Sequence, residues 1–455
     1  MPFQFDTIGV LDTGGTLAGS IVKKLRALGV ASVLLSAARP DMDKSIKGAI
    51  IAGNGIVLKA TEGALENILS MPVPILVLGA NCEPVVRLFS GRTAENAFEK
   101  RAAHVEFLES RLFSSLSEGD RYFERLPDVS LGESMRATAR AEGKVCAFEH
   151  TEKSIFGAFF DIEKNDPDGL SILENFARVI SGCEFSWNMD GYLNIARESM
   201  QKMYPSGKVT VACSGGLLSA VTAVIANSAL SDRAEAVMVD TGLLPEDEME
   251  TGRRAISDAC GMKVSIIDAK DEIRAALKGV VKTREKRDIV YKTIRKALMS
   301  CGSSVLFASG TDEFSPVHGL FREEIRTLGK ILGLPDAFLT RRPFPGAGMA
   351  VRISGEITED KIECLRKADA IFESEIKNAS IDKKLWQYYA SLIEAENGAF
   401  IALHALLSSD SLNGYAYRLP YDVIERTVMR IMDETAFPEG IVYDVSGRMA
   451  SFFSL

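Results

Sequence analysis

Two series of short apolar runs, each alternating with amphipathic segments, constrain the fold of this chain more than any other feature. The first series lies in residues 1 to about 185 and includes TIGVLD, ASVLLS, GAIIAG and PILVLGA. The second begins near Val209 and includes VTVACSGG, AEAVMVDTG, KVSIIDA and SVLFASGT. This βαβ rhythm is typical of parallel sheets flanked by helices, so we expect two doubly wound α/β units.

The sequence pattern changes from Arg341 onward. Strand-like segments there bracket helical ones, and the chain ends with GIVYDVSGRMASFFSL. This pattern predicts a small α+β module, in which we expect a helix around His404. A chain of 455 residues is too long for one ordinary core. We therefore expect three domains, at 1–185, 186–338 and 339–455.

The composition is that of a soluble globular protein, with 46% apolar and 25% charged residues. The net charge of −9 leaves no basic surface for nucleic acid. No apolar run reaches the roughly 18 residues that span a bilayer. The N-terminus lacks a basic leader, and the seven cysteines form no Cys-x-x-Cys pair. We expect a cytoplasmic protein with reduced thiols, no membrane or nucleic-acid partner, and no metal ligated by its side chains.

A possible phosphate loop follows the run VTVAC. Ser214, Gly215 and Gly216 precede an apolar helix start, and glycines at such a turn let backbone N–H groups surround an anion. Leu217 and Leu218 come next, where phosphate chemistry favours polar side chains. Two interpretations stay open: a weak anion or nucleotide site, and a strand-to-helix turn that serves the fold alone.

An ordered series of segments resembles the glutamine-hydrolysing GMP synthases across nearly the whole chain. RRPFPGAGMAVRISGEIT, ADAIFESEI and RLPYDVIERTVMRIMDE are similar to that family's dimerisation domain. SGGLLSA, VDTGLL, LKGVVKTREKR and LFREEIRTLGKILGLP match its ATP-pyrophosphatase domain, and GVLDTGGTLAGSIVKKLRALGV and FEHTEKSIFGAFF match its amidotransferase domain. The resemblance implies a flavodoxin-type class I glutamine amidotransferase domain, a doubly wound PP-loop domain of the adenine nucleotide α-hydrolase type, and an α+β dimerisation domain.

In that family, one domain hydrolyses glutamine to ammonia. The second uses ATP and magnesium to adenylate XMP, and ammonia then displaces AMP to give GMP. The resemblance therefore implies a carbon–nitrogen ligase of purine biosynthesis. Each of the two reactions requires particular side chains, whose positions can be compared with this sequence.

The amidotransferase positions have lost most of the required groups. The family places its nucleophile in a Gly-x-Cys-x-Gly turn, and Asn81 occupies that position, with Cys82 one residue late. Asp161 stands where the family has its histidine base, and Glu163 stands where the orienting carboxylate belongs. The oxyanion loop corresponds to AGNG at 52–55. A thiolate and a neighbouring base are both needed for this chemistry, so we predict no glutaminase activity.

The ATP-pyrophosphatase positions keep the frame of the loop. Ser214, Gly215, Gly216 and Ser219 match the family's Ser-Gly-Gly-Val-Asp-Ser-Ser, whereas Leu218 replaces its aspartate. The family's lid, which closes over ATP, is missing after residue 311. The candidate nucleotide- and phosphate-binding residues are Ser214, Gly215, Gly216, Ser219, Asp240, Gly310 and Thr311. ATP and Mg²⁺ remain candidate cofactors if this loop still binds them.

The XMP positions have changed most at the C-terminus, where only the positive charge of Arg448 matches the family pattern. The candidate residues for a remaining substrate-anion pocket are Lys286, Arg287, Arg342 and Arg448. His404 stands at a basic position of the family, and we interpret it as structural. Residues 341–455 predict a homodimer, or a heterodimer with an authentic GMP synthase.

The losses replace polar groups by apolar ones in three sites, while the segments that specify packing match the family. We therefore favour a GMP synthase homologue that has lost glutaminase and XMP-amidating activity and acts by binding, as a regulatory or structural protein. An alternative is a divergent ATP-dependent adenylating ligase on a purine-like substrate, which uses free ammonia or another nucleophile. An active glutamine-dependent GMP synthase is the third hypothesis.

Overall fold

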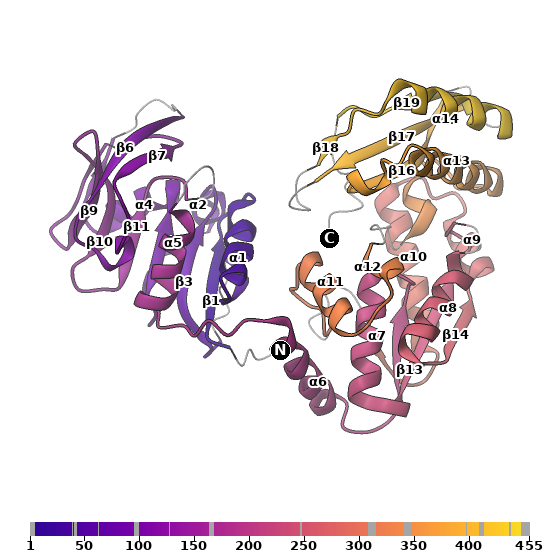
Figure 1. Cartoon of the computed structure of the whole chain (residues 1–455), viewed down its shortest axis with the longest axis horizontal. Coiled ribbons are helices and arrows are strands. Elements are labelled where there is room, and N and C mark those ends of the chain that lie inside the picture. The colour runs from indigo at the N-terminus through magenta and orange to yellow at the C-terminus, as the bar shows by residue number, and fades with distance from the viewer. Residues whose placement is uncertain are drawn as a thin grey trace. The chain divides into compact units, whose positions relative to one another are not determined.

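The structure of the chain is a computed structural model that divides into two compact units, Met1–Tyr192 and Leu193–Leu455. Each unit is described by itself (Figure 1). None of the helices in the described residues combines the length and apolar character needed for a membrane crossing. The structure describes residues 5–38, 40, 43–61, 63–94, 100–126, 128–162, 168–245, 248–307, 315–340, 347–396, 398–408, 414–435 and 438–446.

The first unit contains eleven strands and several short helices among its described residues. Its strands are β1 (Thr7–Asp12), β2 (Ala31–Ser36), β3 (Ile46–Ala52), β4 (Ile75–Leu78), β5 (Arg92–Thr93), β6 (Arg101–Phe107), β7 (Gly119–Phe123), β8 (Val129–Ser130), β9 (Met135–Ala141), β10 (Lys144–His150) and β11 (Ile155–Ala158). Its helices are α1 (Leu17–Ala27), α2 (Ile56–Ala60), α3 (Ala64–Leu69), η1 (Gly79–Asn81), α4 (Cys82–Leu88), η2 (Arg111–Phe113), α5 (Gly169–Glu174) and η3 (Asn175–Ile180).

Nine of these strands form one mixed sheet in the order β2-β1-β3-β4-β11-β10-β9-β6-β7. The first five strands of this order, β2, β1, β3, β4 and β11, pair in parallel, as predicted. The pairs from β11 through β10, β9 and β6 to β7 are antiparallel. The prediction of a purely parallel sheet was therefore wrong for this half. At one of these reversals, Glu142 and Gly143 both have positive φ and form a two-residue turn between β9 and β10.

The second unit begins at Leu193, within the helix α6 (Met189–Met203). Its other helices are α7 (Leu217–Leu230), η4 (Ser231–Arg233), α8 (Glu248–Cys260), α9 (Lys270–Leu277), α10 (Thr283–Met299), α11 (Arg322–Ile331), α12 (Asp336–Leu339), η5 (Gly348–Val351), α13 (Glu359–Asn378), η6 (Asp382–Lys384) and α14 (Tyr421–Glu434). Its strands are β12 (Val209–Cys213), β13 (Ala234–Asp240), β14 (Val264–Asp268), β15 (Ser304–Leu306), β16 (Gln387–Ala395), β17 (Gly398–Leu407), β18 (Tyr415–Ala416) and β19 (Pro438–Tyr443).

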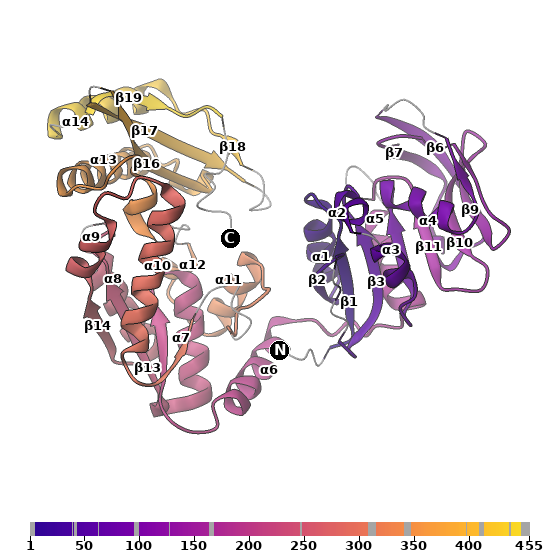
Figure 2. The ribbon, with the colours of Figure 1, turned by 180° about the vertical axis from the view of Figure 1, so that it is seen from behind.

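The first sheet of this unit is parallel throughout, in the order β14-β13-β12-β15. Helices α7, α8 and α10 pack against its strands, as Figure 2 shows from behind. This arrangement agrees with the predicted second α/β series. The parallel strands bring their carboxyl ends, with Ser214 and Asp240, to the same edge of the sheet.

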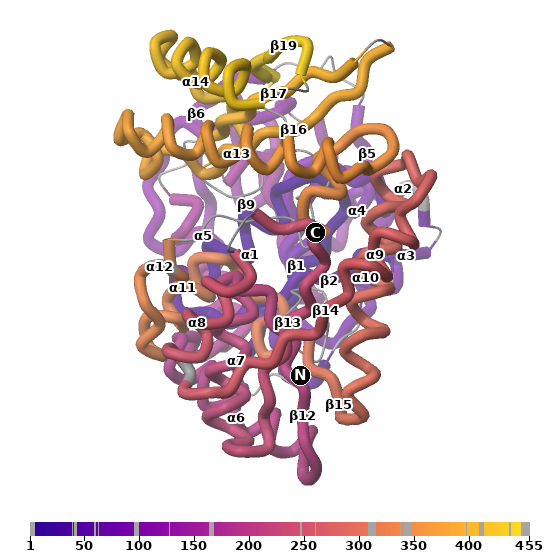
Figure 3. The backbone as a smooth tube through the Cα atoms, turned by 90° about the vertical axis from the view of Figure 1, so that its right-hand side faces the viewer, coloured from indigo at the N-terminus to yellow at the C-terminus, as the bar shows by residue number. Residues whose placement is uncertain are grey.

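The second sheet of this unit contains β16, β17, β18 and β19. Helices α13 and α14 contact each other beside these strands (Figure 3), and their apolar residues join one core with Tyr388, Leu392 and Leu403. The opposite face presents Tyr389 and His404. The predicted helix around His404 was wrong, because residues 387–395 and 398–407 pair as antiparallel strands with only two residues between them.

Candidate functional site

A strand-to-helix turn follows β4 in the first unit and positions Asn81. This residue is 1% exposed, and its Nδ2 donates to the Gly53 carbonyl at 3.0 Å and to the Leu78 carbonyl at 3.1 Å. Its backbone has ordinary helical dihedral angles, φ −70° and ψ −16°. A nucleophile elbow holds its reactive residue in a strained turn, and Asn81 lacks that strain. The amide instead ties the end of β4 to the loop after β3.

After β3, the backbone N–H groups of Asn54, Gly55 and Ile56 donate to acceptors of this chain. The N–H of Asn54 donates to the Gly14 carbonyl at 2.9 Å, and the N–H of Gly55 donates to Thr13 Oγ1 at 3.2 Å. The N–H of Ile56 donates to Asn54 Oδ1 at 3.1 Å. An oxyanion hole requires N–H groups that point at the developing charge. These three N–H groups already have acceptors.

Cys82 is the first residue of α4, and its side chain is fully buried. Its Sγ donates to the carbonyls of Val77, at 3.2 Å, and Ala158, at 3.4 Å. Burial raises the pKa of this thiol strongly, and the bond to Ala158 offsets only part of that effect. A thiol of this kind is a poor nucleophile because the thiolate is the reactive form.

Asp161 occupies the predicted base position, and its backbone N–H donates to the Tyr122 carbonyl at 2.8 Å. Glu163 lies outside the described residues. The imidazole of His150 lies at the other end of the sheet, because His150 follows the residue paired with Phe156, near the start of β11. Asn81 follows β4, whose last residue is level with Ala158 at the end of β11. His150 is thus remote from the turn at Asn81.

The corresponding turn of the second unit joins β12 to α7. Ser219 Oγ donates to the Gly216 carbonyl at 2.9 Å and accepts the Ser214 N–H at 3.2 Å, with Ser214 Oγ 3.3 Å away. Gly215 has φ +74°, which explains the need for glycine at this bend. The structure thus brings the four predicted loop residues together, and the buried hydroxyl of Ser219 fixes the turn.

Asp240 ends β13 at the same sheet edge. Its Oδ1 accepts the Gly242 N–H at 3.0 Å, and its Oδ2 lies 3.3 Å from Lys270 Nζ. Beside it is a hollow of about 460 Å³. Arg366 also lines the hollow and donates to the carbonyls of Gly242 and Leu244. Sequence reasoning missed Lys270 and Arg366, since neither lies in a motif and only the fold brings them to Asp240.

The residues at this edge do not fit a magnesium–ATP complex. Magnesium prefers carboxylate and phosphate oxygens. Leu218 stands at the position of the carboxylate that the resemblance implies, and both oxygens of Asp240 already have protein partners. Within the described part of the chain, no group of three or more His, Cys, Asp or Glu side chains is placed to hold a metal ion.

The predicted anion pocket is only partly described. Lys286 is fully buried in α10, where its Nζ donates to the Ile353 carbonyl at 2.6 Å, and burial lowers its pKa to about 8. Arg287 lies 3.6 Å from the Asp288 carboxylate. The remaining predicted site residues, Arg342, Arg448, Gly310 and Thr311, lie outside the described residues. The anion pocket therefore stays a prediction.

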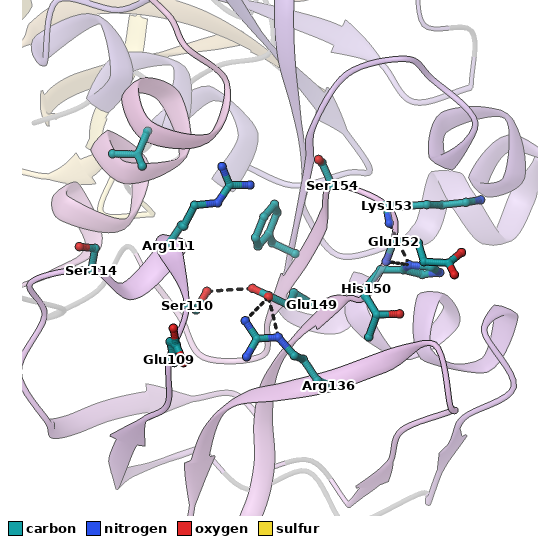
Figure 4. Close-up of a pocket in the computed structure, with 13 residues that line it drawn as sticks. Glu109, Ser110, Arg111, Ser114, Arg136, Glu149, His150, Glu152, Lys153 and Ser154 are labelled. Carbon is teal, nitrogen blue, oxygen red and sulfur yellow. Dashed lines mark hydrogen bonds and ion pairs between the residues drawn. The ribbon is translucent and has the colours of Figure 1, made fainter.

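A second hollow, of about 520 Å³, opens near the start of β11 in the first unit (Figure 4). Its floor is a hydrogen-bonded cluster in which Glu149 accepts from Ser110 at 3.0 Å and from Arg136 Nε at 2.8 Å. His150 Nδ1 accepts the N–H groups of Glu152 and Lys153, both at 3.1 Å. Sequence reasoning did not find this hollow, because its residues come from separate strands and loops without a common motif.

The protein has a mixed α/β fold with a large, partly parallel nine-stranded sheet. A strand-to-helix turn follows β4 of this sheet, and another follows β12 of the four-stranded parallel sheet. A protein of Bacillus cereus strain B4264, named glutamine-hydrolyzing GMP synthase, is 29% identical to this chain over 506 aligned positions that cover 98% of each protein. Proteins with the same name from Bacillus cytotoxicus, at 28%, and Bacillus anthracis, at 29%, cover 98% of both chains as well. The chain is therefore related to the glutamine-hydrolysing GMP synthases along nearly its whole length.

No family model matches this chain. A solved structure from Thermoplasma acidophilum, of a protein described as one subunit of a GMP synthase, covers 38% of this chain and 93% of its own length. It has 20% sequence identity and a TM-score of 0.34, a similarity too low to support any conclusion. The relationship to GMP synthases therefore depends on the full-length sequence similarity.

Proposed function

We propose that this GMP synthase relative neither hydrolyses glutamine nor aminates XMP, and that it acts by binding. The observation on which this proposal depends is the buried amide of Asn81, which is hydrogen-bonded to Gly53 and Leu78 at the position of the nucleophile. An amide has no reactive lone pair comparable to that of a thiolate, so covalent catalysis is not available there.

Two further features of the first unit support the loss of glutaminase activity. The N–H groups of residues 54–56 already donate to protein acceptors, and Asp161 supplies a carboxylate where an imidazole is needed. In hydrolase triads, the loss of nucleophile and base together costs on the order of 10⁴ to 10⁶ in rate. In the proposed function, the protein therefore does not produce ammonia from glutamine.

In the second unit, the residues at the turn between β12 and α7 support the loss of the ATP-dependent step. Phosphoryl and adenylyl transfer depend on a metal and fixed donors that neutralise the developing charge. Leu218 offers no oxygen, and the hydroxyl of Ser219 is bound to the backbone of its own loop. We infer that the turn keeps its shape without supporting catalysis.

The domain assignment is part of the same proposal. Residues 1–185 correspond to a class I glutamine amidotransferase-like domain, 186–338 to a PP-loop domain, and 339–455 to a dimerisation-like domain. The parallel strand order β14-β13-β12-β15, with a glycine turn after β12, supports the PP-loop assignment. The parallel half of the nine-stranded sheet supports the flavodoxin-type assignment.

We also propose a dimer through the C-terminal module, either with a second copy or with an authentic GMP synthase. Tyr421, Met429 and Met432 are exposed on α14, and large apolar side chains of this kind suit a protein interface. Light scattering at micromolar concentration tests the homodimer. A monomer that also fails to bind an authentic synthase would contradict the proposal.

The proposed loss of synthase activity is tested with XMP, ATP, Mg²⁺ and ammonium, with pyrophosphate release as the readout. We expect no release above the rate without protein. Isothermal titration with XMP and with magnesium–ATP then determines whether either nucleotide is still bound. Any XMP-dependent release of pyrophosphate would contradict the proposal and support the adenylating ligase instead.

A further inference from the structure

Three polar side chains converge on the second sheet of the C-terminal unit. Ser391 lies on β16, His404 lies on β17, and Asp444 directly follows β19. Ser391 Oγ is 2.8 Å from His404 Nε2, and His404 Nδ1 is 3.1 Å from Asp444 Oδ2. Three neighbouring strands thus align a hydroxyl, an imidazole and a carboxylate in one hydrogen-bonded chain.

The position of Asp444 determines which nitrogen of His404 holds the proton. Its Oδ1 accepts the Ser446 N–H at 2.8 Å, and its backbone N–H donates to the Leu403 carbonyl at 3.0 Å. Burial acts to raise the pKa of Asp444, but the hydrogen bonds from Ser446, together with the interaction with His404, outweigh it and lower the pKa. The ionised carboxylate accepts a hydrogen bond from the Nδ1–H group, which leaves Nε2 without a proton and able to accept a hydrogen bond from Ser391.

The imidazole is also held in orientation by its neighbours. The Tyr389 ring stacks on it with centroids 4.4 Å apart and an interplanar angle of 13°. Burial lowers the pKa of His404, Asp444 acts in the opposite direction, and the positive charge of Arg352 lowers it further. His404 is therefore a neutral base near pH 7, which is the form that can accept a proton from a hydroxyl.

These groups lie on the sheet face opposite α13 and α14. The core on the helix-covered face includes Tyr388, Leu392 and Leu403, so their alternating neighbours point the other way. On that second face, Ile393 lies two residues beyond Ser391, and Val442 lies two residues before Asp444. Both are 45% exposed. An apolar group next to Ser391 would therefore contact apolar side chains.

We propose that Ser391, His404 and Asp444 form a catalytic triad that hydrolyses carboxylic esters with a short apolar acyl group. Ser391 Oγ attacks the carbonyl carbon while its proton passes to His404 Nε2. The carbon–oxygen bond to the alcohol breaks, and the alcohol leaves with that proton. Water then attacks the acyl-serine and gives a proton to His404, which returns it to Ser391 as the carboxylic acid departs. Asp444 acts through His404 and is a positioning residue.

This site is separate from the turns at Asn81 and Ser219, and the proposal does not depend on the function proposed above. Ser391 and Asp444 are not among the positions that the resemblance assigns to glutamine hydrolysis or adenylation, and His404 stands at a basic position of the family to which the sequence assigns only a structural role. The geometry satisfies the requirements for an activated hydroxyl: a base within hydrogen-bond distance and a third group that orients the base.

The first experiment labels the intact protein with a fluorophosphonate probe and locates the adduct by mass spectrometry. We expect labelling at Ser391 that is lost in Ser391→Ala and falls on the order of 100-fold or more in His404→Gln. Ser265→Ala, at an exposed serine on β14, is the matched control and should label like the wild type. Circular dichroism establishes that each variant is folded. No adduct on Ser391 in folded wild-type protein, or equal labelling in His404→Gln, would overturn the proposal.

The second experiment measures hydrolysis of p-nitrophenyl butyrate between pH 5 and 9. We expect activity that Ser391→Ala abolishes and that rises as His404 loses its proton. Asp444→Asn removes a group that raises the pKa of His404, so the rising limb should move about one unit to lower pH while the rate falls. A purely structural role for Asp444 would leave the pH of that limb unchanged. Hydrolysis that is unaffected by Ser391→Ala would contradict the triad.

Discussion

The strand-to-helix turns of the two units share one backbone plan but differ in what holds them. In the first unit, the buried amide of Asn81 connects the turn to a different loop, at Gly53. In the second, the Ser219 hydroxyl connects the turn only to itself, at Gly216 and Ser214. In the first unit, Asn81 joins the turn after β4 to the loop after β3. In the second, the turn is held by its own residues beside a hollow lined by Asp240 and Lys270.

This difference shows two ways in which a strand-to-helix turn keeps its shape. A turn needs backbone conformations that glycine adopts easily and backbone polar groups that have partners, whatever chemistry takes place beside it. At Asn81 the side-chain amide itself donates to the carbonyls of Gly53 and Leu78. At Ser219 the serine of the family pattern is present and holds the turn, and the differences fall on the neighbouring Leu218 and Ala220. The two turns should therefore respond differently to substitution.

The largest effect is expected from Asn81→Ala. The variant removes the donor to the buried Leu78 carbonyl and to the partly buried Gly53 carbonyl, so we expect a loss of about 3 kcal/mol in the free energy of unfolding. Urea unfolding followed by tryptophan fluorescence and circular dichroism measures it. The exposed Asn67→Ala on α3 is the control and should change stability by less than about 0.5 kcal/mol. Equal effects of both substitutions would break the comparison.

The next effect concerns Lys286, the buried cation of the second unit. Its folded pKa of about 8 lies below its ordinary value of 10.5, so the unfolded chain binds more protons between those two pH values. Stability contributed by this group therefore rises from pH 8 to 10.5, and the penalty for burying the charge is fully present below pH 8. Relative to wild type, Lys286→Met should lose this rise, which amounts to at most about 3 kcal/mol for a pKa lowered from 10.5 to about 8.

The measurement is urea unfolding of both proteins at intervals from pH 7 to 10.5. Lys292→Met, an exposed lysine on the same helix, serves as the control and should follow the wild-type dependence. A pH dependence in Lys286→Met that matches wild type would show that this ammonium is not held in a destabilised charged form.

A smaller effect is expected from Ser219→Ala. The substitution removes the donor to the Gly216 carbonyl and the acceptor for the Ser214 N–H, but that loop has nearby solvent because Ser214 is exposed. We expect a loss of about 1 kcal/mol, measured by urea unfolding. Ser206→Ala, in an exposed loop, is the control. A loss as large as that of Asn81→Ala would show that the two turns are held equally.

The smallest effect is expected in thiol labelling, which tests whether Cys82, beside the turn at Asn81, is buried. Cys301 is exposed, whereas Cys82 is buried and its pKa is raised. Iodoacetamide on the native protein should modify Cys301 and leave Cys82 unmodified, because only accessible thiolates react rapidly. Urea-denatured protein is the control, in which both should react. Rapid native labelling of Cys82 would contradict its placement in the core.

The fold was predictable from sequence where the pattern is local and regular. The strands at 7–12, 46–52 and 209–213 follow from short apolar runs with helices between them. The antiparallel half of the first sheet was missed, because the turn at Glu142 and Gly143 is a signal of only two residues. The strand at His404 was missed because its identity depends on pairing with a neighbouring strand, and a single segment does not show its partner.

The candidate site was predictable only as a set of positions. Sequence comparison placed Asn81 and Ser219 at their turns, because glycines and apolar runs surround them. It did not show that the Asn81 side chain donates a hydrogen bond to the Gly53 carbonyl, 28 residues earlier. Nor did it show that the N–H groups of Asn54 and Gly55 have acceptors within the chain. The contact between Ser391, His404 and Asp444 spans three strands. Such contacts are set by sheet register, which no motif in this chain encodes.

The most direct test of the account is glutamine hydrolysis by the intact protein with XMP, ATP and Mg²⁺ present. Glutamate formation from amide-labelled glutamine is followed by nuclear magnetic resonance. We predict no glutamate above the rate in buffer, for the wild type and for Cys82→Ala alike. Glutamine turnover that Asn81→Ala or Cys82→Ala abolishes would contradict the account, since it would require a working nucleophile at the turn after β4.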